Sequence, residues 1–196
     1  MMRRARQLKR AIAAALLAIA VFPSARPAYA HGFGGSGLIH PLTGIDHLLA
    51  MLAVGAWSAQ LGGRYIFGVP AAFVCFMSLG GLLGIAGFSL PWVAGAIAIS
   101  VVVLGSAIAT ERRVSPLVAG TAVAVFGTYH GFSHGSEVGG ASGHSSYVAG
   151  FLVTTAGLHV IGAVAALLAL ESSTGAAWLR RSGGVTALVG VWLLFR

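Results

Sequence analysis

The stretch HPLTGIDHLLAMLAVGAW, residues 40–57, places two histidines and an aspartate directly before an apolar run. Further apolar runs of similar length follow it along the chain. An ionisable group within a membrane-spanning segment is costly, so its presence favours a functional role. The stretch therefore predicts the first of several membrane spans, and its ionisable residues are candidates for part of a metal site.

The composition of the whole chain is typical of an integral membrane protein. Of the 196 residues, 57% are hydrophobic and 8% are charged, and the mean hydropathy is +0.90. A soluble domain carries about 25% charged residues. Half of the twelve basic residues precede residue 31, which leaves six arginines against four acids in the rest of the chain. No basic surface for nucleic acid is expected, and Cys75, the single cysteine, is interpreted as a small core residue.

Residues 1–30 predict a cleaved signal peptide. The basic segment MMRRARQLKR precedes the twelve apolar residues AIAAALLAIAVF, a run too short to cross a hydrocarbon core of about 30 Å. Ala28-Tyr29-Ala30 fits a small-residue cleavage site. An uncleaved anchor helix is the alternative. After cleavage His31 would be the first residue, and its α-amine and imidazole would together chelate a metal, unless the glycine-rich terminus is simply disordered.

Residues 31–196 predict one all-α domain, a polytopic membrane bundle of six transmembrane helices. The expected spans are 41–61, 65–86, 91–110, 115–134, 147–170 and 177–195. Five of the six arginines in this domain fall in or beside alternate loops, so they share one side of the membrane. The positive-inside rule makes that side cytoplasmic. We therefore expect a multi-pass protein of the bacterial inner membrane with a periplasmic mature N-terminus.

The first span carries three candidate ligands. His40 and His47 are seven residues apart, so one continuous helix would place them on the same face. Asp46 would lie roughly 100° away on that helix, where it either faces a neighbouring helix or orients a histidine.

The fourth span carries a second group of candidate ligands in YHGFSHGSE. His130 and His134 have the i, i+4 spacing of helical neighbours, and Glu137 continues the row if the helix persists. Gly131 and Gly135 would let another helix approach closely.

These imidazoles and carboxylates form a nitrogen and oxygen donor set. Such donors suit nickel, cobalt, zinc or copper(II) better than magnesium or calcium. His159 lies about midway through the fifth span, where it either contributes to the path of the ion or hydrogen-bonds across helices. His144 lies in a Gly/Ser-rich segment and is interpreted as a solvated loop residue.

The two motifs resemble those of the HupE/UreJ family of nickel permeases, and the resemblance extends over essentially the whole chain. The first fits the pattern H-P-x-x-G-x-D-H-x-x-x-M, and the second fits H-G-x-x-H-G-x-E. The resemblance implies secondary uptake of nickel, in some members cobalt, that supplies hydrogenase or urease. It also implies functional roles for the matching residues, which are His40, Asp46 and His47 in the first span and His130, His134 and Glu137 in the fourth. The H-x4-D-H pattern of the broader nickel/cobalt transporter family is not matched, because five residues separate His40 from Asp46.

The predicted function is therefore a permease for Ni²⁺, or Co²⁺, and not an enzyme. The sequence has no Walker motif, so coupling to ATP within this chain is not expected, and no prosthetic group is expected either. The ion would be captured near His31 and His40, bound in the first and fourth spans, and passed inward by way of His159. Two alternatives stay open, a membrane metalloenzyme with its metal near the periplasmic face and a structural partner of a metalloenzyme assembly. Formation of a homo-oligomer also stays open.

Overall fold

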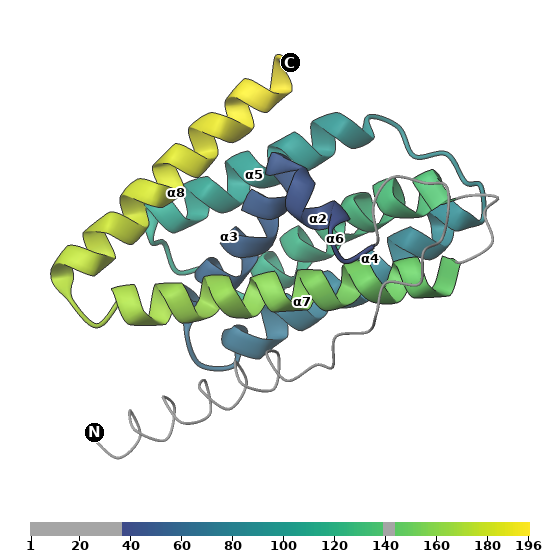
Figure 1. Cartoon of the computed structure of the whole chain (residues 1–196). Coiled ribbons are helices and arrows are strands. Elements are labelled where there is room, and N and C mark those ends of the chain that lie inside the picture. Colours follow the sequence, from purple (N-terminus) through teal and green to yellow (C-terminus); the bar gives the residue numbers. More distant parts are fainter. Residues whose placement is uncertain (1–36, 139–143) are drawn as a thin grey trace. The chain divides into compact units, whose positions relative to one another are not determined.

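The computed structural model describes residues 37–138 and 144–196 (Figure 1). The predicted signal peptide and His31 lie outside the described residues, as do the side chains of His40 and His144. Every regular element in the described part is a helix, which confirms the all-α class. The helices are α2 (His40–Thr43), α3 (Ile45–Leu61), α4 (Tyr65–Ile85), α5 (Val93–Thr110), α6 (Pro116–Val138), α7 (His144–Ala169) and α8 (Ser173–Leu194).

Each of the six predicted spans coincides with one of the helices α3 to α8. By length and apolar composition, α4, α5 and α7 qualify as membrane spans, and α3 is apolar but shorter, with 17 residues. The remaining two helices are long but more polar: α6 ends in HGFSHGSEV, and α8 contains two arginines. The six helices are therefore present in the described part of the chain, whereas six membrane crossings remain a prediction.

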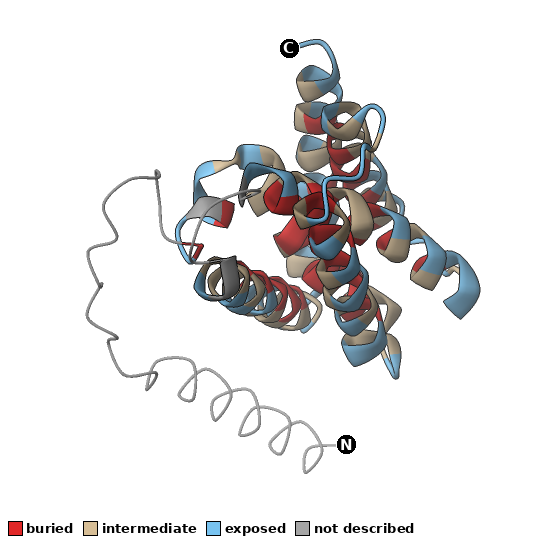
Figure 2. Cartoon of the chain, turned by 90° about the vertical axis from the view of Figure 1, so that its right-hand side faces the viewer, coloured by how far each residue is buried: buried red, intermediate tan, exposed pale blue. Residues whose placement is uncertain are grey.

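Helix α3 is the central helix of the described part of the chain. It packs against α4, α5, α7 and α8, and every residue from Ala53 to Ala59 is buried. Figure 2 shows the same pattern, with buried residues on the inner sides of the helices and exposed residues on the outer sides. Small residues allow the close packing: a Cβ at Gly55 would collide with the carbonyl oxygen of His159 on α7.

Glycines form the contact between α4 and α6, the most extensively packed helix pair. A Cβ at Gly131 would collide with the carbonyl oxygen of Met77, and a Cβ at Gly135 would collide with that of Gly81. The prediction that these two glycines admit a neighbouring helix is confirmed. Because the contact is between backbones, it fixes the position of α6, and with it the depth at which the two histidines of α6 lie.

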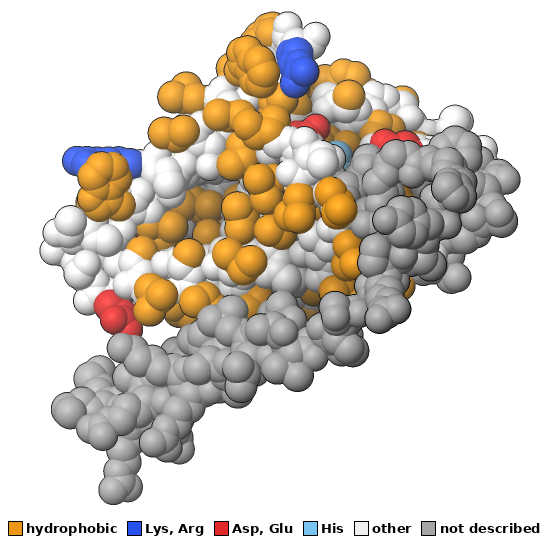
Figure 3. Space-filling view, viewed as in Figure 1, with side chains coloured by type: hydrophobic (Ala, Val, Ile, Leu, Met, Phe, Trp, Pro, Cys, Tyr) orange, Lys and Arg blue, Asp and Glu red, His pale blue; other side chains and the backbone are white. Residues whose placement is uncertain are grey.

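The outer faces of the helices carry large apolar side chains. Phe67, Leu117 and Leu188 are 79%, 77% and 71% exposed. Hydrophobic side chains cover much of the face shown in Figure 3, and few charged side chains interrupt them. Soluble monomers rarely expose apolar patches of this kind, so the surface suits contact with lipid.

Cys75 is exposed on α4, so its interpretation as a core residue was wrong. An apolar run does not separate the inner from the outer face of a membrane helix, because lipid tails are as apolar as a protein core.

Contacts between loops and helix ends test the predicted clustering of the arginines. Three side-chain hydrogen bonds join the end of α3 and the start of α4 to the end of α5 and the loop after it, and that loop to the first half of α8. They link Gln60 to the carbonyl of Ile108 (3.1 Å), Tyr65 to the carbonyl of Val114 (3.1 Å) and Arg180 to Glu111 (2.9 Å). These regions therefore meet at one end of the bundle, as the alternation of arginines along the chain predicts. The assignment of that end to the cytoplasm stays a prediction.

The ion pair between Arg180 and Glu111 is expected to contribute little to stability. Its side chains are 44% and 42% exposed, so solvent screens their attraction. Glu111→Gln should lower the free energy of unfolding by less than about 1 kcal/mol. Thermal unfolding of the purified variant in detergent, beside Arg180→Gln and the double variant, measures this effect. A coupling well above that value would show that the pair is shielded from solvent.

Candidate metal centre

The helix that carries the first motif is interrupted at Gly44. This residue has extended backbone angles (φ −90°, ψ 115°), so α2 ends before it and α3 begins after it. The placement of His40 and His47 on one face of a continuous helix was therefore wrong. Pro41 at the start of α2 and the extended Gly44 confine α2 to a single short turn, and the spacing argument does not apply across the break.

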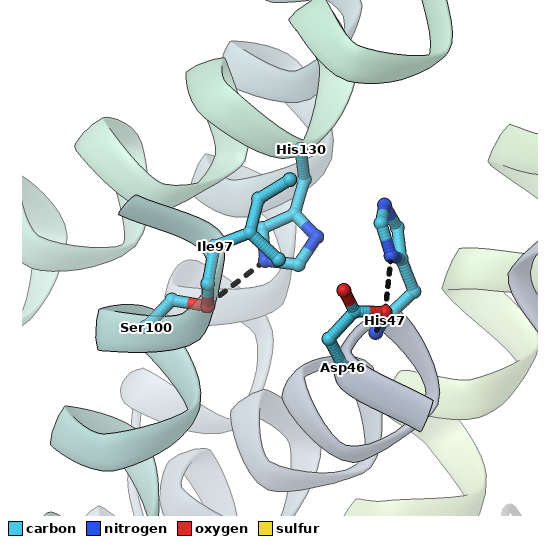
Figure 4. A network of polar contacts seen from close by, with 5 residues as sticks. All are labelled: Asp46, His47, Ile97, Ser100 and His130. Atoms are coloured by element: carbon cyan, nitrogen blue, oxygen red, sulfur yellow. Dashed lines mark hydrogen bonds and ion pairs between the residues drawn. The ribbon is translucent and has the colours of Figure 1, made fainter. Parts of the chain in front are cut away.

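Asp46 holds the imidazole of His47 at the start of α3. One carboxylate oxygen, Oδ1, lies 2.8 Å from Nδ1 of His47 and also accepts a hydrogen bond of 2.8 Å from the backbone N–H of the same residue (Figure 4). Of the two roles considered for Asp46, the structure shows the one in which it orients a histidine. Because an ionised carboxylate only accepts hydrogen bonds, Nδ1 of His47 carries a proton, and in the neutral imidazole the lone pair is then on Nε2.

The helix α6 persists to Val138, so His130 and His134 do lie one turn apart on a continuous helix. Both side chains are fully buried. The ring of His47 contacts both of them, with centroid separations of 4.8 Å to His130 and 4.7 Å to His134. The break at Gly44 does not prevent the convergence of the two motifs, and these three histidines are named the histidine cluster.

Two ring nitrogens of the cluster are buried without a hydrogen-bond partner, Nε2 of His47 and Nδ1 of His130. The other nitrogen of His130, Nε2, lies 2.9 Å from the hydroxyl of Ser100 on α5 (Figure 4). A buried polar atom that lacks a partner costs about 1–3 kcal/mol. Such atoms are expected where a bound ligand supplies the missing interaction.

The spacing of the rings is compatible with a shared metal ion. With metal–nitrogen bonds of about 2.1 Å, two imidazoles that bind the same ion have ring centroids roughly 5 Å apart. Within the described residues no group of three or more His, Cys, Asp or Glu side chains is arranged so that it could hold a metal ion. Binding an ion in the cluster would therefore require the imidazoles to change their orientations.

Aromatic rings pack around the cluster. The ring of Phe151 stacks on His134 at 4.9 Å, and the ring of Phe73 lies 5.6 Å from that of His130 and 5.2 Å from that of His159. Phe73 thus contacts both histidines, and Nε2 of His159 is buried without a hydrogen-bond partner. The sequence reasoning missed both phenylalanines, because an aromatic residue in an apolar run gives no signal of its neighbours.

Glu137 lies in the last turn of α6 and is exposed, whereas the histidine cluster is mostly buried. His40 belongs to α2, which contacts α3 and α7. The described segment before α2 packs on α7, where Thr154 donates a hydrogen bond to the carbonyl of Leu38 (2.8 Å).

His144 is the first residue of α7 and not part of a loop. The interpretation of His144 as a loop residue was therefore wrong for its backbone.

Fold and site together define a class of protein: a helical membrane protein with a buried histidine cluster between its helices. Comparison with known proteins places it within that class. Residues 11–193 match the family model described as HupE / UreJ protein, and the chain belongs to this family. It is 43% identical over 177 residues to the protein named Protein HupE of Rhizobium leguminosarum bv. viciae, which covers 87% of this chain and 92% of the relative. No solved structure matches the chain.

Proposed function

We propose that this protein is a secondary transporter that takes up Ni²⁺ across the bacterial inner membrane and supplies it to hydrogenase or urease. In this proposal residues 1–30 are a cleaved signal peptide, and residues 31–196 form a permease domain with six spans and a periplasmic N-terminus. Co²⁺ is the second candidate substrate. The resemblance of both histidine motifs to those of the HupE/UreJ family favours nickel among the metals that bind imidazoles.

The observation that supports the proposal most strongly is the contact of three imidazoles from two distant motifs. The ring of His47 contacts the buried rings of His130 and His134. The helices that carry these residues have apolar outer surfaces. Two of their nitrogens are buried without partners. Imidazole nitrogens are good ligands for nickel and cobalt and poor ligands for magnesium and calcium.

The remaining candidate ligands fit a path through the protein. His31 and His40 precede the cluster in the chain and would capture the ion before it enters. Glu137 is exposed at the end of α6 and would attract the cation to that end of the helix. His159, whose ring contacts Phe73, would receive the ion next, because its buried Nε2 has no hydrogen-bond partner in the protein.

Uptake of radioactive nickel at nanomolar concentration tests the proposal. The protein is produced in cells that lack their own nickel transporters, and uptake is compared with cells that carry an empty vector. Excess cobalt, zinc or magnesium is added as competitor. We expect saturable uptake that cobalt reduces and magnesium leaves unchanged.

Absence of uptake above background for any of these cations would contradict the permease. Metal analysis of the purified protein would then decide between the alternatives. A tightly retained metal would support a metalloenzyme, and no bound metal would support a structural partner.

Gly44→Ala is expected to weaken uptake through the pair formed by Asp46 and His47. The backbone angles of Gly44 are open to any residue, so the constraint is steric. An added Cβ would lie 2.8 Å from Oδ1 of Asp46 and 3.3 Å from Nδ1 of His47, so the carboxylate must move. Loss of such an orienting group lowers metal affinity about 10- to 100-fold, and we expect a KM for nickel raised roughly tenfold.

Gly68→Ala on α4 is the matched control, because a Cβ at this position meets nothing within 4 Å. Its nickel uptake should equal that of the wild type. An unchanged KM in Gly44→Ala would mean that the position of the Asp46 carboxylate does not matter for transport.

A further inference from the structure

Ser100 lies on α5 and is fully buried. It belongs to neither histidine motif, and it is the one hydroxyl residue in the apolar run VAGAIAISVVVLG, residues 93–105. Its Oγ makes two hydrogen bonds, one of 2.6 Å to the carbonyl oxygen of Ile97 and one of 2.9 Å to Nε2 of His130. Figure 4 shows the bond between the Ser100 hydroxyl and the ring of His130.

The direction of each hydrogen bond follows from the number of protons available. A serine hydroxyl has one proton to donate and can also accept. The carbonyl oxygen of Ile97 can only accept, so at 2.6 Å the hydroxyl proton must lie between the two oxygens. Ser100 is therefore the acceptor in its second bond, and Nε2 of His130 is the donor.

This arrangement determines the tautomer of His130. A neutral imidazole carries one N–H, and in His130 it is at Nε2. The lone pair is then on Nδ1, which is buried and has no hydrogen-bond partner. In Figure 4 this second ring nitrogen lies on the side of the ring that faces His47.

We infer that Ser100 is a positioning residue of the metal site, which holds His130 in the Nε2–H tautomer and directs the lone pair of Nδ1 to the transported ion. The part of this inference that concerns the transported ion rests on the proposed function. The Ser100 hydroxyl acts on His130 as the Asp46 carboxylate acts on His47, so each of the two histidines is oriented by a residue from outside the cluster. Such outer partners raise metal affinity by about 10- to 100-fold.

The tautomer can be measured without any metal or transport. Protein labelled with ¹⁵N in its histidine side chains gives distinct NMR signals for a protonated and an unprotonated ring nitrogen. His130 is assigned by comparison with His130→Gln. In the wild type we expect a protonated Nε2 and an unprotonated Nδ1, and in Ser100→Ala a mixture of the two tautomers. A protonated Nδ1 in the wild type would overturn the inference.

The affinity for nickel tests the consequence for the site. Titration of purified, metal-free protein with Ni²⁺ should give a Kd that is 10- to 100-fold higher for Ser100→Ala than for the wild type. Ser100→Thr keeps the hydroxyl and should restore most of the affinity. Ser58→Ala is the matched control, because Ser58 is equally buried and donates to the carbonyl of Gly55 in the same way (2.7 Å), while no histidine bonds to its hydroxyl.

A double variant separates a positioning role from a general structural one. If Ser100 acts through His130, Ser100→Ala should have no further effect on nickel affinity once His130 has been changed to alanine. Equal Kd values for Ser100→Ala and the wild type, or additive effects in the double variant, would overturn the inference. If the wild type bound no nickel while its tautomer was as expected, the proposed function would fail and the assignment of the tautomer would stand.

Discussion

His47→Ala is expected to reduce saturable nickel uptake to background. The ring of His47 is the one that contacts both other imidazoles of the cluster, and its buried Nε2 has no hydrogen-bond partner in the protein. Its removal takes away a proposed ligand and also the contact between the two motifs. Because loss of an outer partner alone costs about 10- to 100-fold in affinity, loss of the ligand should cost more than about 100-fold. The measurement is initial uptake as a function of nickel concentration.

Asp46→Asn should have an intermediate effect in the same experiment. The amide oxygen can still accept the hydrogen bond from Nδ1 of His47, but the negative charge is lost. We expect a KM raised about 10-fold or more with the maximal rate largely kept.

His144→Ala serves as the control for these variants, because His144 is not among the proposed ligands. Its uptake should equal that of the wild type. All variants are compared at equal amounts of protein in the membrane. Wild-type uptake by His47→Ala would rule out the histidine cluster as the transport site, whatever the protein transports.

Gly131→Ala is expected to cause the largest loss of stability. A Cβ at this position would collide with the carbonyl oxygen of Met77, and a backbone atom cannot rotate away as the end of a side chain can. The helices α4 and α6 would have to separate, which displaces His130 beside it. Overpacking of a well-packed contact costs about 1–3 kcal/mol, and we expect a loss at or above about 3 kcal/mol. Thermal unfolding in detergent measures it.

Gly120→Ala on the same helix tests the explanation. A Cβ at Gly120 meets nothing within 4 Å, and alanine favours a helix over glycine by about 1 kcal/mol. This variant should be as stable as the wild type or slightly more so. Similar losses in the two variants would show that the contact with Met77 is not the cause.

The sequence predicted the helices because their signals are local. Apolar runs of about 20 residues separated by Gly, Pro or Arg determine where each helix begins and ends, and the structure agrees within a few residues for α3 to α8. The i, i+4 spacing of His130 and His134 is likewise a property of one helix, and it is confirmed. The same reasoning failed for His40 and His47, because the extended backbone at Gly44 interrupts the helix between them.

The contacts between helices were not available from the sequence, because they depend on how residues far apart in the chain are packed. The sequence by itself determined the all-α class, the two histidine motifs and the glycines that allow close packing. Only the tertiary structure decided that α3 is central, that His47 meets both histidines of α6, and that Ser100 from α5 bonds to one of them. The physical reason is that a helix period relates residues within one element, whereas a shared site depends on the crossing of several helices, which glycine contacts between backbones fix here.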